Sequence, residues 1–485
     1  MPSVKKNFFY NLVLTLCGYI FPLITYPYVS RILGVQNIGI CNFVDSIIDY
    51  FVLFSMLGIG TFGVREIARV RKDKERRNIV FSNLVFFNIV STFIAATILI
   101  ICTFIIPAFV NYKPFLLIGV AKLLFNVFLI EWFYQGIQDF RYITIRTLIV
   151  RILYVVSVFV FIRESADVLL YFFLTAIAVV ITAVINCIHA RKYIRFSFRS
   201  LDVRMFIVPI ITFGYYKILI SMYTTFNTAF LGFTSGDVEV GYFATATKLY
   251  AIFMSVLSAF TTVMVPKVSE LLHDGQKERL QWIANQTLSI VMAVSIPVIV
   301  LCQFCASDII HIIAGPGYEG AMIPFRIVIF LLLIIGTEQI LIQQFLLAST
   351  NNTRQILILS TVGAITGVSV NVLLTPKFGC VGPSIAWGLS ELVVLFFGIV
   401  FVKRTLGITV QYRRLAIDML WSIPYILLLY VVYSFHLELW HNVLLSVIVT
   451  IVVFSVINLW LHANKQIQEL VSSLIRIIVN KNHAN

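Results

Sequence analysis

The chain alternates long apolar runs with short polar interruptions from one end to the other. A helix that crosses a bilayer needs about 20 apolar residues, and the runs repeatedly reach that length. The pattern predicts fourteen membrane-spanning helices, each placed to within a few residues. The predicted spans are residues 8–30, 38–63, 79–106, 114–136, 143–162, 167–190, 205–231, 240–265, 283–305, 320–347, 354–375, 381–402, 413–434 and 440–462.

A weak internal repeat divides these spans into two groups. The stretch that begins at Gly34 and contains Gly39 aligns with the stretch that begins at Gly236 and contains Gly241. Both copies link an outward-running to an inward-running span, as in transporters whose lobes are related by an axis along the membrane normal. We therefore expect an all-α membrane protein with a six-helix lobe at 1–204, a second at 205–406, two extra helices at 407–462 and a cytoplasmic amphipathic tail at 463–485.

The composition supports a membrane protein without a soluble catalytic domain. Of 485 residues, 60% are apolar and 12% are charged, about half of the charged share of a soluble protein. The sequence has no GxxxxGK[ST] phosphate loop, no His-Glu-x-x-His zinc motif and no long outer loop with paired carboxylates. These absences favour a transporter without a cofactor or metal over an ATPase or a metalloenzyme. A membrane glycosyltransferase or polymerase remains as a minor alternative.

The positions of the cations predict the topology. Most of the 36 lysines and arginines fall in alternate connections, among them residues 65–77, 191–204 and the group Arg141, Arg146 and Arg151. Because cytoplasmic loops retain positive charge, we expect both termini in the cytoplasm. The net charge of +14 therefore reports membrane orientation and does not indicate nucleic-acid binding.

Four cations are predicted inside the spans: Lys122, Lys217, Lys248 and Arg326. Each would cost on the order of 2.5 to 3.5 kcal/mol at the centre of the bilayer, so we expect them to line an aqueous cavity. An ion pair or a snorkelling side chain is the alternative for each. Clustered cations suit an anionic group, since charge-assisted hydrogen bonds offset part of the desolvation cost. The predicted acidic residues at the same depth include Asp45, Asp49 and Glu338.

Polar side chains follow the helical period on four of the predicted spans. Thr224 and Thr228 share a face with Lys217 on the seventh span, and Asn42 shares one with Asp45 on the second. The first and eighth spans carry similar stripes, which are what a cavity between two lobes would need. Close helix contacts made by hydroxyls and amides are the alternative.

Two further features of this cavity leave alternatives open. Pro22 and Pro27 interrupt the first span and predict a bend, which acts either as a gating hinge or as a static kink. Asp45 and Asp49 lie one turn apart, so they could share a proton, bind a cation or neutralise a neighbouring lysine.

Several motifs resemble one family along nearly the whole chain. The stretches Pro27–Gly34, Arg65–Ala68, Glu131–Gly136 and Asp139–Thr144, and later Leu374–Gly379, are similar to bacterial polysaccharide flippases of the Wzx type. The resemblance implies the multidrug/oligosaccharidyl-lipid/polysaccharide exporter fold, with twelve to fourteen helices in two lobes.

The resemblance also implies a function in surface polysaccharide biosynthesis. A monomer in the bacterial cytoplasmic membrane would pass an undecaprenyl-diphosphate-linked oligosaccharide such as O-antigen from the inner to the outer leaflet by alternating access, together with other polysaccharide assembly proteins. Cavity cations would bind the diphosphate, which matches Lys217 and Lys248, and Arg31 in the Pro27–Gly34 stretch becomes a further candidate. The alternative within this fold is a drug exporter coupled to H⁺ or Na⁺ through Asp45, Asp49 and Glu338. The sequence encodes neither the sugar nor the energy source.

Overall fold

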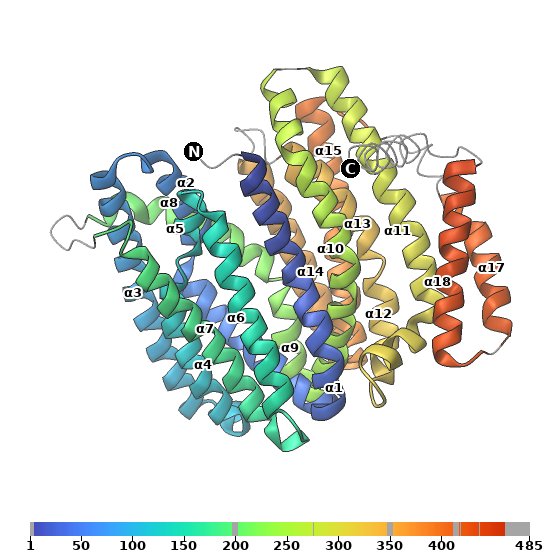
Figure 1. Ribbon diagram of the computed structural model, residues 1–485, viewed down its shortest axis with the longest axis horizontal. Helices are drawn as coiled ribbons and strands as arrows, with labels where there is room; N and C mark the ends of the chain where they lie inside the picture. Colours follow the sequence, from blue (N-terminus) through green and yellow to red (C-terminus); the bar gives the residue numbers. More distant parts are fainter. Residues whose placement is uncertain are drawn as a thin grey trace, which may run out of the picture. The chain divides into compact units, whose positions relative to one another are not determined.

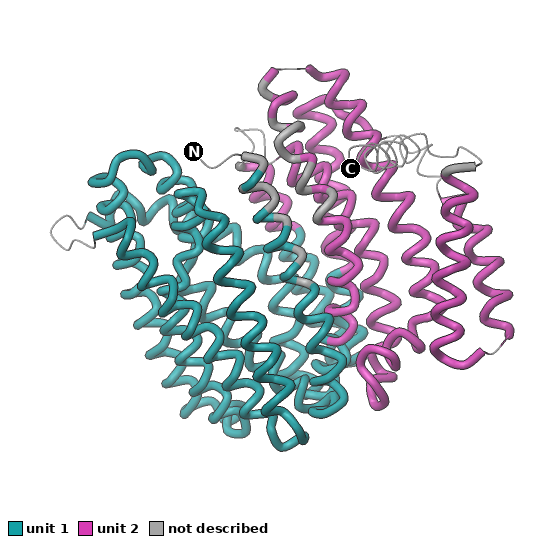
Figure 2. The backbone as a smooth tube through the Cα atoms, in the orientation of Figure 1, with its two compact units in different colours: residues 1–244, 363–387 teal, residues 245–362, 388–485 magenta. Residues whose placement is uncertain are grey.

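The computed structural model describes residues 4–195, 202–274, 276–346, 353–410, 417, 419–435 and 437–460, which form helices joined by short turns (Figure 1). The chain divides into two compact units (Figure 2): unit 1 contains residues 1–244 and 363–387, and unit 2 contains residues 245–362 and 388–485. The predicted lobe boundaries remain a prediction, and the tail predicted at 463–485 lies outside the described residues.

Unit 1 begins with a very long helix and is completed by parts of three later ones, α10, α14 and α15. Its own elements are α1 (Val4–Met56), α2 (Ile59–Val70), α3 (Lys74–Ile105), η1 (Pro107–Tyr112), α4 (Lys113–Asn126), η2 (Val127–Leu129), α5 (Glu131–Gly136), α6 (Phe140–Phe161), η3 (Ser165–Asp167), α7 (Val168–Ala190), α8 (Arg204–Ser221) and α9 (Thr225–Ser235).

Unit 2 holds most of the remaining helices, together with the rest of the three that it shares with unit 1. The shared helices are α10 (Asp237–His273), α14 (Thr353–Phe378) and α15 (Val381–Leu406). The others are α11 (Lys277–Ile313), η4 (Glu319–Ala321), α12 (Met322–Val328), α13 (Leu331–Glu338), η5 (Gln339–Leu346), α17 (Ser422–Ser434), α18 (Leu439–Ser455) and η6 (Val456–Trp460).

The helices are long and apolar enough for a multi-pass membrane protein. Within the described residues, 12 helices could span a bilayer, and the helix Ser422–Ser434 is a shorter apolar one. The helix α1 has 53 residues, about 80 Å at 1.5 Å per residue, and is therefore far too long for one crossing of a 30 Å core. It contains a non-helical residue at Gly34, between the first and second predicted spans. The count is thus compatible with fourteen crossings.

Several predicted spans are not continuous helices. The second is interrupted at Leu57 and Gly58, between α1 and α2. The fourth is interrupted at Ile130, which adopts a left-handed conformation with φ 35° between η2 and α5. The seventh unwinds over residues 222–224 between α8 and α9, and the tenth is divided into α12, α13 and the π-helical segment η5. The hydropathy pattern did not predict these breaks, because the few polar residues at them do not interrupt the long apolar runs.

The basic connection predicted at residues 65–77 is mostly helical. The helix α2 continues to Val70, and α3 begins after Asp73, whose carboxylate accepts hydrogen bonds from the backbone N–H groups of Glu75 and Arg76. Such a cap satisfies backbone donors that have no partner within the helix. The polar interruption is therefore short because the charged residues themselves form helix ends.

The two glycine stretches found in the sequence contact each other within unit 1. Gly34 and Gly236 have nearly the same backbone conformation, with φ 76° and 86° and extended ψ, a region open essentially to glycine alone. A methyl group at Gly39 would overlap the carbonyl oxygen of Asp237, and one at Gly241 would overlap the carbonyl oxygen of Val35. The contacts are reciprocal, as expected where two equivalent segments meet.

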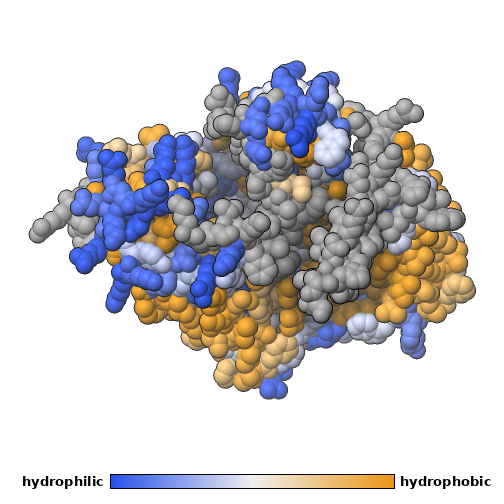
Figure 3. All heavy atoms as spheres, turned by 45° about the horizontal axis from the view of Figure 1, so that its top comes forward, coloured by the Kyte–Doolittle hydropathy of each residue, from blue (hydrophilic) through white to orange (hydrophobic). Residues whose placement is uncertain are grey.

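Large apolar side chains cover much of the outside of the helices. Phe93 and Phe104 of α3 are 70% and 61% exposed, and Met205 and Val208 of α8 are exposed to a similar degree. In Figure 3 apolar side chains cover the lower part of the visible face, and hydrophilic side chains gather along its upper edge. Exposed apolar surface of this extent is what lipid, and not water, would cover.

Candidate functional site

Lys217 is a half-buried cation of unit 1 without an anionic partner. It lies on α8, one turn before the last helical residue, Ser221. Its ammonium group faces α2, where a methyl group added at Gly60 would lie 3.2 Å from Nζ. Among the described residues it makes no hydrogen bond or ion pair. The charge is therefore desolvated without compensation from the protein.

Arg151 is a second such cation, and it lies on α6 and not in a connection. Its Nη1 atom is buried without a hydrogen-bond partner, and a methyl group at Gly18 of α1 would lie 3.8 Å from it. Arg146 and Arg151, which we grouped with the cytoplasmic cations, both lie within α6, which extends from Phe140 to Phe161. The side of the membrane on which they lie remains a prediction.

Two other cations of unit 1 have carboxylate partners. The Nζ atom of Lys122 lies 2.5 Å from Oδ1 of Asp45, and it also lies 4.5 Å from the centre of the Phe172 ring. The buried guanidinium of Arg146 lies 2.8 Å from Oε1 of Glu131. Lys122 therefore matches the ion-pair alternative, whereas Lys217 and Arg151 do not.

The remaining predicted residues of α1 are spread along it. Arg31 is exposed and donates a hydrogen bond to the carbonyl oxygen of Pro27 at 3.0 Å. Asn42 is half-buried and donates to the carbonyl oxygen of Ile38 at 2.6 Å, whereas Asp49 is exposed. The helix keeps its backbone conformation through Pro22 as well as Pro27, so the hinge remains a prediction.

The polar stripe predicted for the seventh span is divided by the break between α8 and α9. Thr224 is the residue before α9, and Thr228 lies within that helix, so neither continues the face of Lys217 on one regular helix as expected. The backbone groups freed by the break find other partners: Tyr50 donates to the carbonyl oxygen of Ser221 at 3.2 Å. In a membrane, such partners are what make an interrupted helix tolerable.

An amide cluster supports α9 next to this break. Asn227 is fully buried and donates to the carbonyl oxygen of Tyr223 at 2.8 Å, while its own Oδ1 accepts from Asn371 at 2.6 Å. The hydroxyl of Thr375 donates in turn to Oδ1 of Asn371. Because all these residues belong to unit 1, the cluster fixes α9 against α14 within that unit.

The segment Glu131–Gly136, the most distinctive motif of the sequence, builds the packing between α5 and α2. Its aromatic residues are buried. A methyl group at Gly63 would lie 2.6 Å from the Trp132 ring, and one at Gly136 would lie 2.7 Å from Cβ of Ile67. The motif therefore positions helices, which its sequence alone did not indicate.

Hydrogen bonds from tyrosine hydroxyl groups connect α5 and α6 to α7. Tyr134 donates to the carbonyl oxygen of Asn186 at 2.6 Å, and Tyr142 donates to its Oδ1 at 2.9 Å. Tyr193 donates to Asp139 at 2.9 Å. Burial and this hydrogen bond raise the pKa of Tyr193 to about 12, so its hydroxyl remains a neutral donor at physiological pH.

Unit 2 contains two predicted cations. Lys248 is half-buried on α10. Arg326 is half-buried on α12, and its Nε atom is buried without a partner, while its carbonyl oxygen accepts from Gln303 at 2.8 Å. Of these two cations, Arg326 is the one with a buried donor that has no partner among the described residues.

A pair of buried carboxyl groups is the second feature of unit 2. Glu338 at the end of α13 and Glu391 on α15 are 8% and 7% exposed, and their side chains lie close enough to interact electrostatically. Two carboxyl groups that share a buried site cannot readily both be charged. The sequence indicates Glu338 as a coupling candidate but not Glu391 as its partner, because the two lie 53 positions apart in the chain and only the packing brings them together.

Amide side chains continue this polar region along η5. Gln339 accepts a hydrogen bond from Thr261 at 2.9 Å, and Gln344 donates to the carbonyl oxygen of the same residue at 2.7 Å. Short π-helical segments occur preferentially at functional sites. Among the described residues, no group of three or more His, Cys, Asp or Glu side chains could hold a metal ion.

Comparison with known proteins places this geometry in a family. The model of the family "Polysaccharide biosynthesis protein" matches residues 4–272. A protein of Escherichia coli (strain K12) named "Putative O-antigen transporter" is 23% identical over 409 residues, which cover 83% of this chain and 97% of that protein. A protein of the same name from Shigella dysenteriae is 22% identical over 271 residues, or 55% of this chain and 68% of that protein.

Solved structures share the fold. The inward closed conformation of the lipid II flippase MurJ matches with a TM-score of 0.75 at 16% identity and covers 93% of this chain and 98% of that one. An inward-facing multidrug resistance MATE family transporter of the MOP superfamily matches with a TM-score of 0.64 at 13% identity, over 80% and 94% of the two chains. This multi-pass membrane protein therefore has the MurJ and MATE fold and belongs to the polysaccharide biosynthesis protein family.

Proposed function

We propose that this protein is a flippase that moves an undecaprenyl-diphosphate-linked oligosaccharide from the inner to the outer leaflet of the bacterial cytoplasmic membrane by alternating access. The diphosphate and sugars would enter a polar interior while the polyprenyl chain stays in lipid. Both termini would lie in the cytoplasm, and the flipped product would go to the proteins that assemble the surface polysaccharide.

The observation that carries this proposal is the pair of uncompensated cations in unit 1. Lys217 and Arg151 are half-buried, and neither forms an ion pair among the described residues, although Arg151 is attracted by Glu131 from beyond ion-pair distance. A buried charge without a partner is strongly unfavourable, so its persistence favours a partner that comes from outside. A diphosphate supplies that partner through charge-assisted hydrogen bonds. The similarity to proteins named for O-antigen transport and lipid II flipping supports the same class of cargo.

Lys248 and Arg326 of unit 2 are candidates for further contacts with the headgroup. Arg326 has a buried donor without a partner, and Arg31 is exposed on α1. These residues, together with the polar side chains around them, would bind the sugars and the second phosphate group of the diphosphate. Their contribution should be smaller than that of the two uncompensated cations of unit 1.

A transport assay with matched lysine variants tests the proposal. We expect Lys217→Ala to lower the rate of translocation of lipid-linked oligosaccharide about 10- to 100-fold, since hydrogen bonds to charged groups contribute about 1.5 to 3 kcal/mol. Lys248→Ala should give a smaller loss, and Lys217→Arg should retain part of the activity. Lys72→Ala, which removes an exposed lysine between α2 and α3, is the control and should transport normally. Normal transport by Lys217→Ala at equal protein amount would refute the diphosphate role.

A cation-coupled exporter of small molecules is the second candidate. The observation that favours it is the pair of buried carboxyl groups, Glu338 and Glu391, since a proton shared by such a pair would be a means of coupling transport to a proton gradient. The same vesicles distinguish the two candidates. Movement of a small cationic drug against a pH gradient, without movement of lipid-linked oligosaccharide, would favour the exporter.

A further inference from the structure

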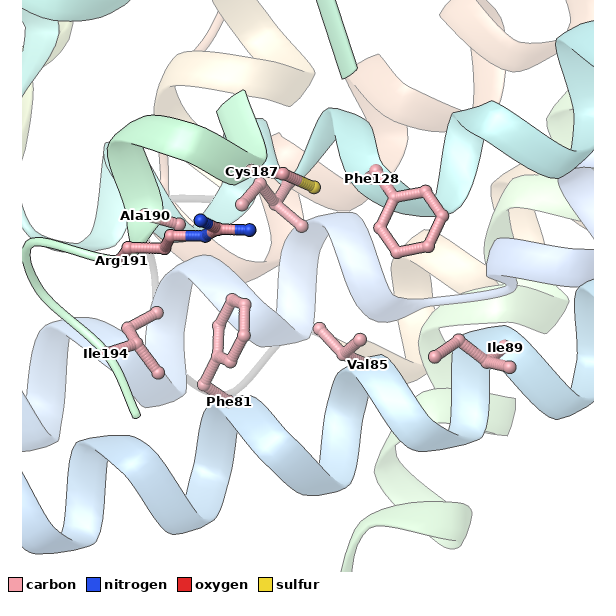
Figure 4. Close-up of a pocket in the computed structure, with 9 residues that line it drawn as sticks. Phe81, Val85, Ile89, Phe128, Cys187, Ala190, Arg191 and Ile194 are labelled. Carbon is pink, nitrogen blue, oxygen red and sulfur yellow. The ribbon is translucent and has the colours of Figure 1, made fainter. Parts of the chain in front are cut away.

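A continuous apolar groove runs along the outside of α3 in unit 1. It consists of two adjoining cavities of about 350 Å³ and 220 Å³, which share Ile89 and Phe128 in their linings. The first also contains Phe81 and Arg191, and the second ends at Phe93. Figure 4 shows the first cavity, with apolar side chains from α3 on one side and Phe128 and Cys187 on the other.

The groove is about as long as one leaflet is thick. From Phe81 to Phe93 the helix α3 rises about 18 Å at 1.5 Å per residue, and half of a 30 Å hydrocarbon core is about 15 Å. The groove is also open to the outside: Ile89 is 40% exposed and Phe128 is 37% exposed. In a membrane such an open apolar surface contacts hydrocarbon chains.

A cation without a partner stands at one end of the groove. Arg191 follows the last residue of α7, and its guanidinium extends into the first cavity near Cys187 and Phe81 (Figure 4). A cation is favourable at the carboxyl end of a helix, yet among the described residues Arg191 makes no hydrogen bond or ion pair. Its five N–H donors are therefore free for an anion.

The surroundings of Arg191 belong to the basic end of unit 1. Arg77 at the start of α3 donates to the carbonyl oxygens of Arg71 and Tyr193 at 3.0 Å and 2.7 Å, so its guanidinium is used within the protein. Lys192 is exposed, and its ammonium lies 5.7 Å from the centre of the Tyr193 ring. Arg191 is thus the cation of this group that combines a free guanidinium with a position in the apolar groove.

We propose that this groove is a binding site for an anionic glycerophospholipid, such as phosphatidylglycerol, in the leaflet at the basic end of unit 1. One acyl chain lies along Phe81, Ile89 and Phe93, and the phosphodiester accepts a forked pair of hydrogen bonds from Arg191. Basic pockets between membrane helices are known to bind anionic lipid headgroups. The single charge of a phosphodiester matches that of Arg191, and the length of the groove matches a chain confined to one leaflet, whereas a polyprenyl carrier is much longer.

Photo-crosslinking tests this site on the full-length protein in phosphatidylcholine nanodiscs. The probe is a phosphatidylglycerol that carries a diazirine in one acyl chain, and the labelled peptides are mapped. We expect label on Ile89 and Phe128, displaced by unlabelled phosphatidylglycerol and not by phosphatidylcholine. Arg191→Gln should lower this labelling about tenfold, in keeping with the loss of a charge-assisted pair, whereas the control Lys192→Gln should leave it nearly unchanged.

A second variant separates the apolar part of the site from the charged part. Ile89→Trp fills the point that the two cavities share and should abolish labelling of Phe128, without the risk of disturbing a buried core, since Ile89 is partly exposed. Equal loss of labelling in Arg191→Gln and Lys192→Gln would overturn the proposal. So would displacement of the probe by undecaprenyl phosphate at concentrations where phosphatidylglycerol fails, because the groove would then belong to the carrier lipid.

Discussion

The helix α6 carries two arginines, one buried and one half-buried, whose hydrogen-bond partners differ. Arg146 lies 2.8 Å from the carboxylate of Glu131 and takes part in the packed region around α5. Arg151 faces α1 at Gly18 and has a buried Nη1 atom without a partner. Side chains five positions apart on a helix differ in direction by about 140°. The guanidinium of Arg146 therefore contacts Glu131, whereas that of Arg151 faces α1.

Lys122 and Lys217 differ in the same way. Lys122 has both a carboxylate and an aromatic ring next to its ammonium group, whereas Lys217 lies beside the backbone of Gly60. Removing a cation that has a carboxylate partner should lower the free energy of unfolding. Removing a cation without such a partner should lower the transport rate and leave the free energy of unfolding unchanged or higher.

The largest expected effect is on transport by the double variant Lys217→Ala/Arg151→Ala. If both cations bind the diphosphate, the combined loss should be on the order of 100-fold or more, since each charged hydrogen bond contributes about 1.5 to 3 kcal/mol. The thermal unfolding midpoint should stay at or above that of the wild type. Initial rates in vesicles and scanning fluorimetry on the same preparation measure the two quantities. A lower midpoint with normal transport per folded molecule would reverse the assignment of these cations.

The second effect is on stability, through the pair of Arg146 and Glu131. Arg146→Ala should lower the free energy of unfolding by about 2 kcal/mol, less than the 3 to 5 kcal/mol of a fully buried pair, because the Glu131 side chain is 46% exposed. The thermal midpoint should fall while transport per folded molecule stays near normal. Adding Glu131→Gln to Arg146→Ala removes the unpaired carboxylate and should recover part of the loss. If the double variant is no more stable than Arg146→Ala, then lost packing, and not the unpaired carboxylate, explains the lower free energy of unfolding.

The smallest effect concerns Lys122 and Asp45, because the Asp45 side chain is 41% exposed and partly exposed ion pairs contribute little to stability. A double-mutant cycle with Lys122→Met and Asp45→Asn should give a coupling of about 1 kcal/mol or less in stability. If the cycle instead shows coupling in transport and none in stability, Lys122 belongs with Lys217 among the residues that bind cargo.

The sequence predicted the helical membrane fold well because periodicity and length determine the spans. It could not predict the interruptions at Ile130 or at residues 222–224, since the few polar residues near them do not end the apolar run. A break becomes stable only when a distant group satisfies the freed backbone, as Tyr50 does for Ser221. Such partners depend on tertiary packing, which hydropathy does not encode.

The candidate site was predictable only in part. Counting charges within apolar runs found Lys217, but it placed Arg151 in a connection and could not tell that Lys122 has a partner. The family motif Glu131–Gly136 was visible, yet its role in packing α5 against α2 follows only from the contacts of Trp132 and Gly136. Residue type and depth identify candidates, and partner geometry separates those that stabilise the fold from those left for a ligand.

The reciprocal crossing at Gly39 and Gly241 has a mechanical and an evolutionary consequence. Because backbone meets backbone there, with no room for even a methyl group, there are no rotamers through which the two segments could slide past each other. The two segments can rotate about this contact but cannot slide along it. A mutation at either glycine would force both segments apart, so we expect the two positions, which the sequence predicts to be the copies of a repeated stretch, to change together or not at all.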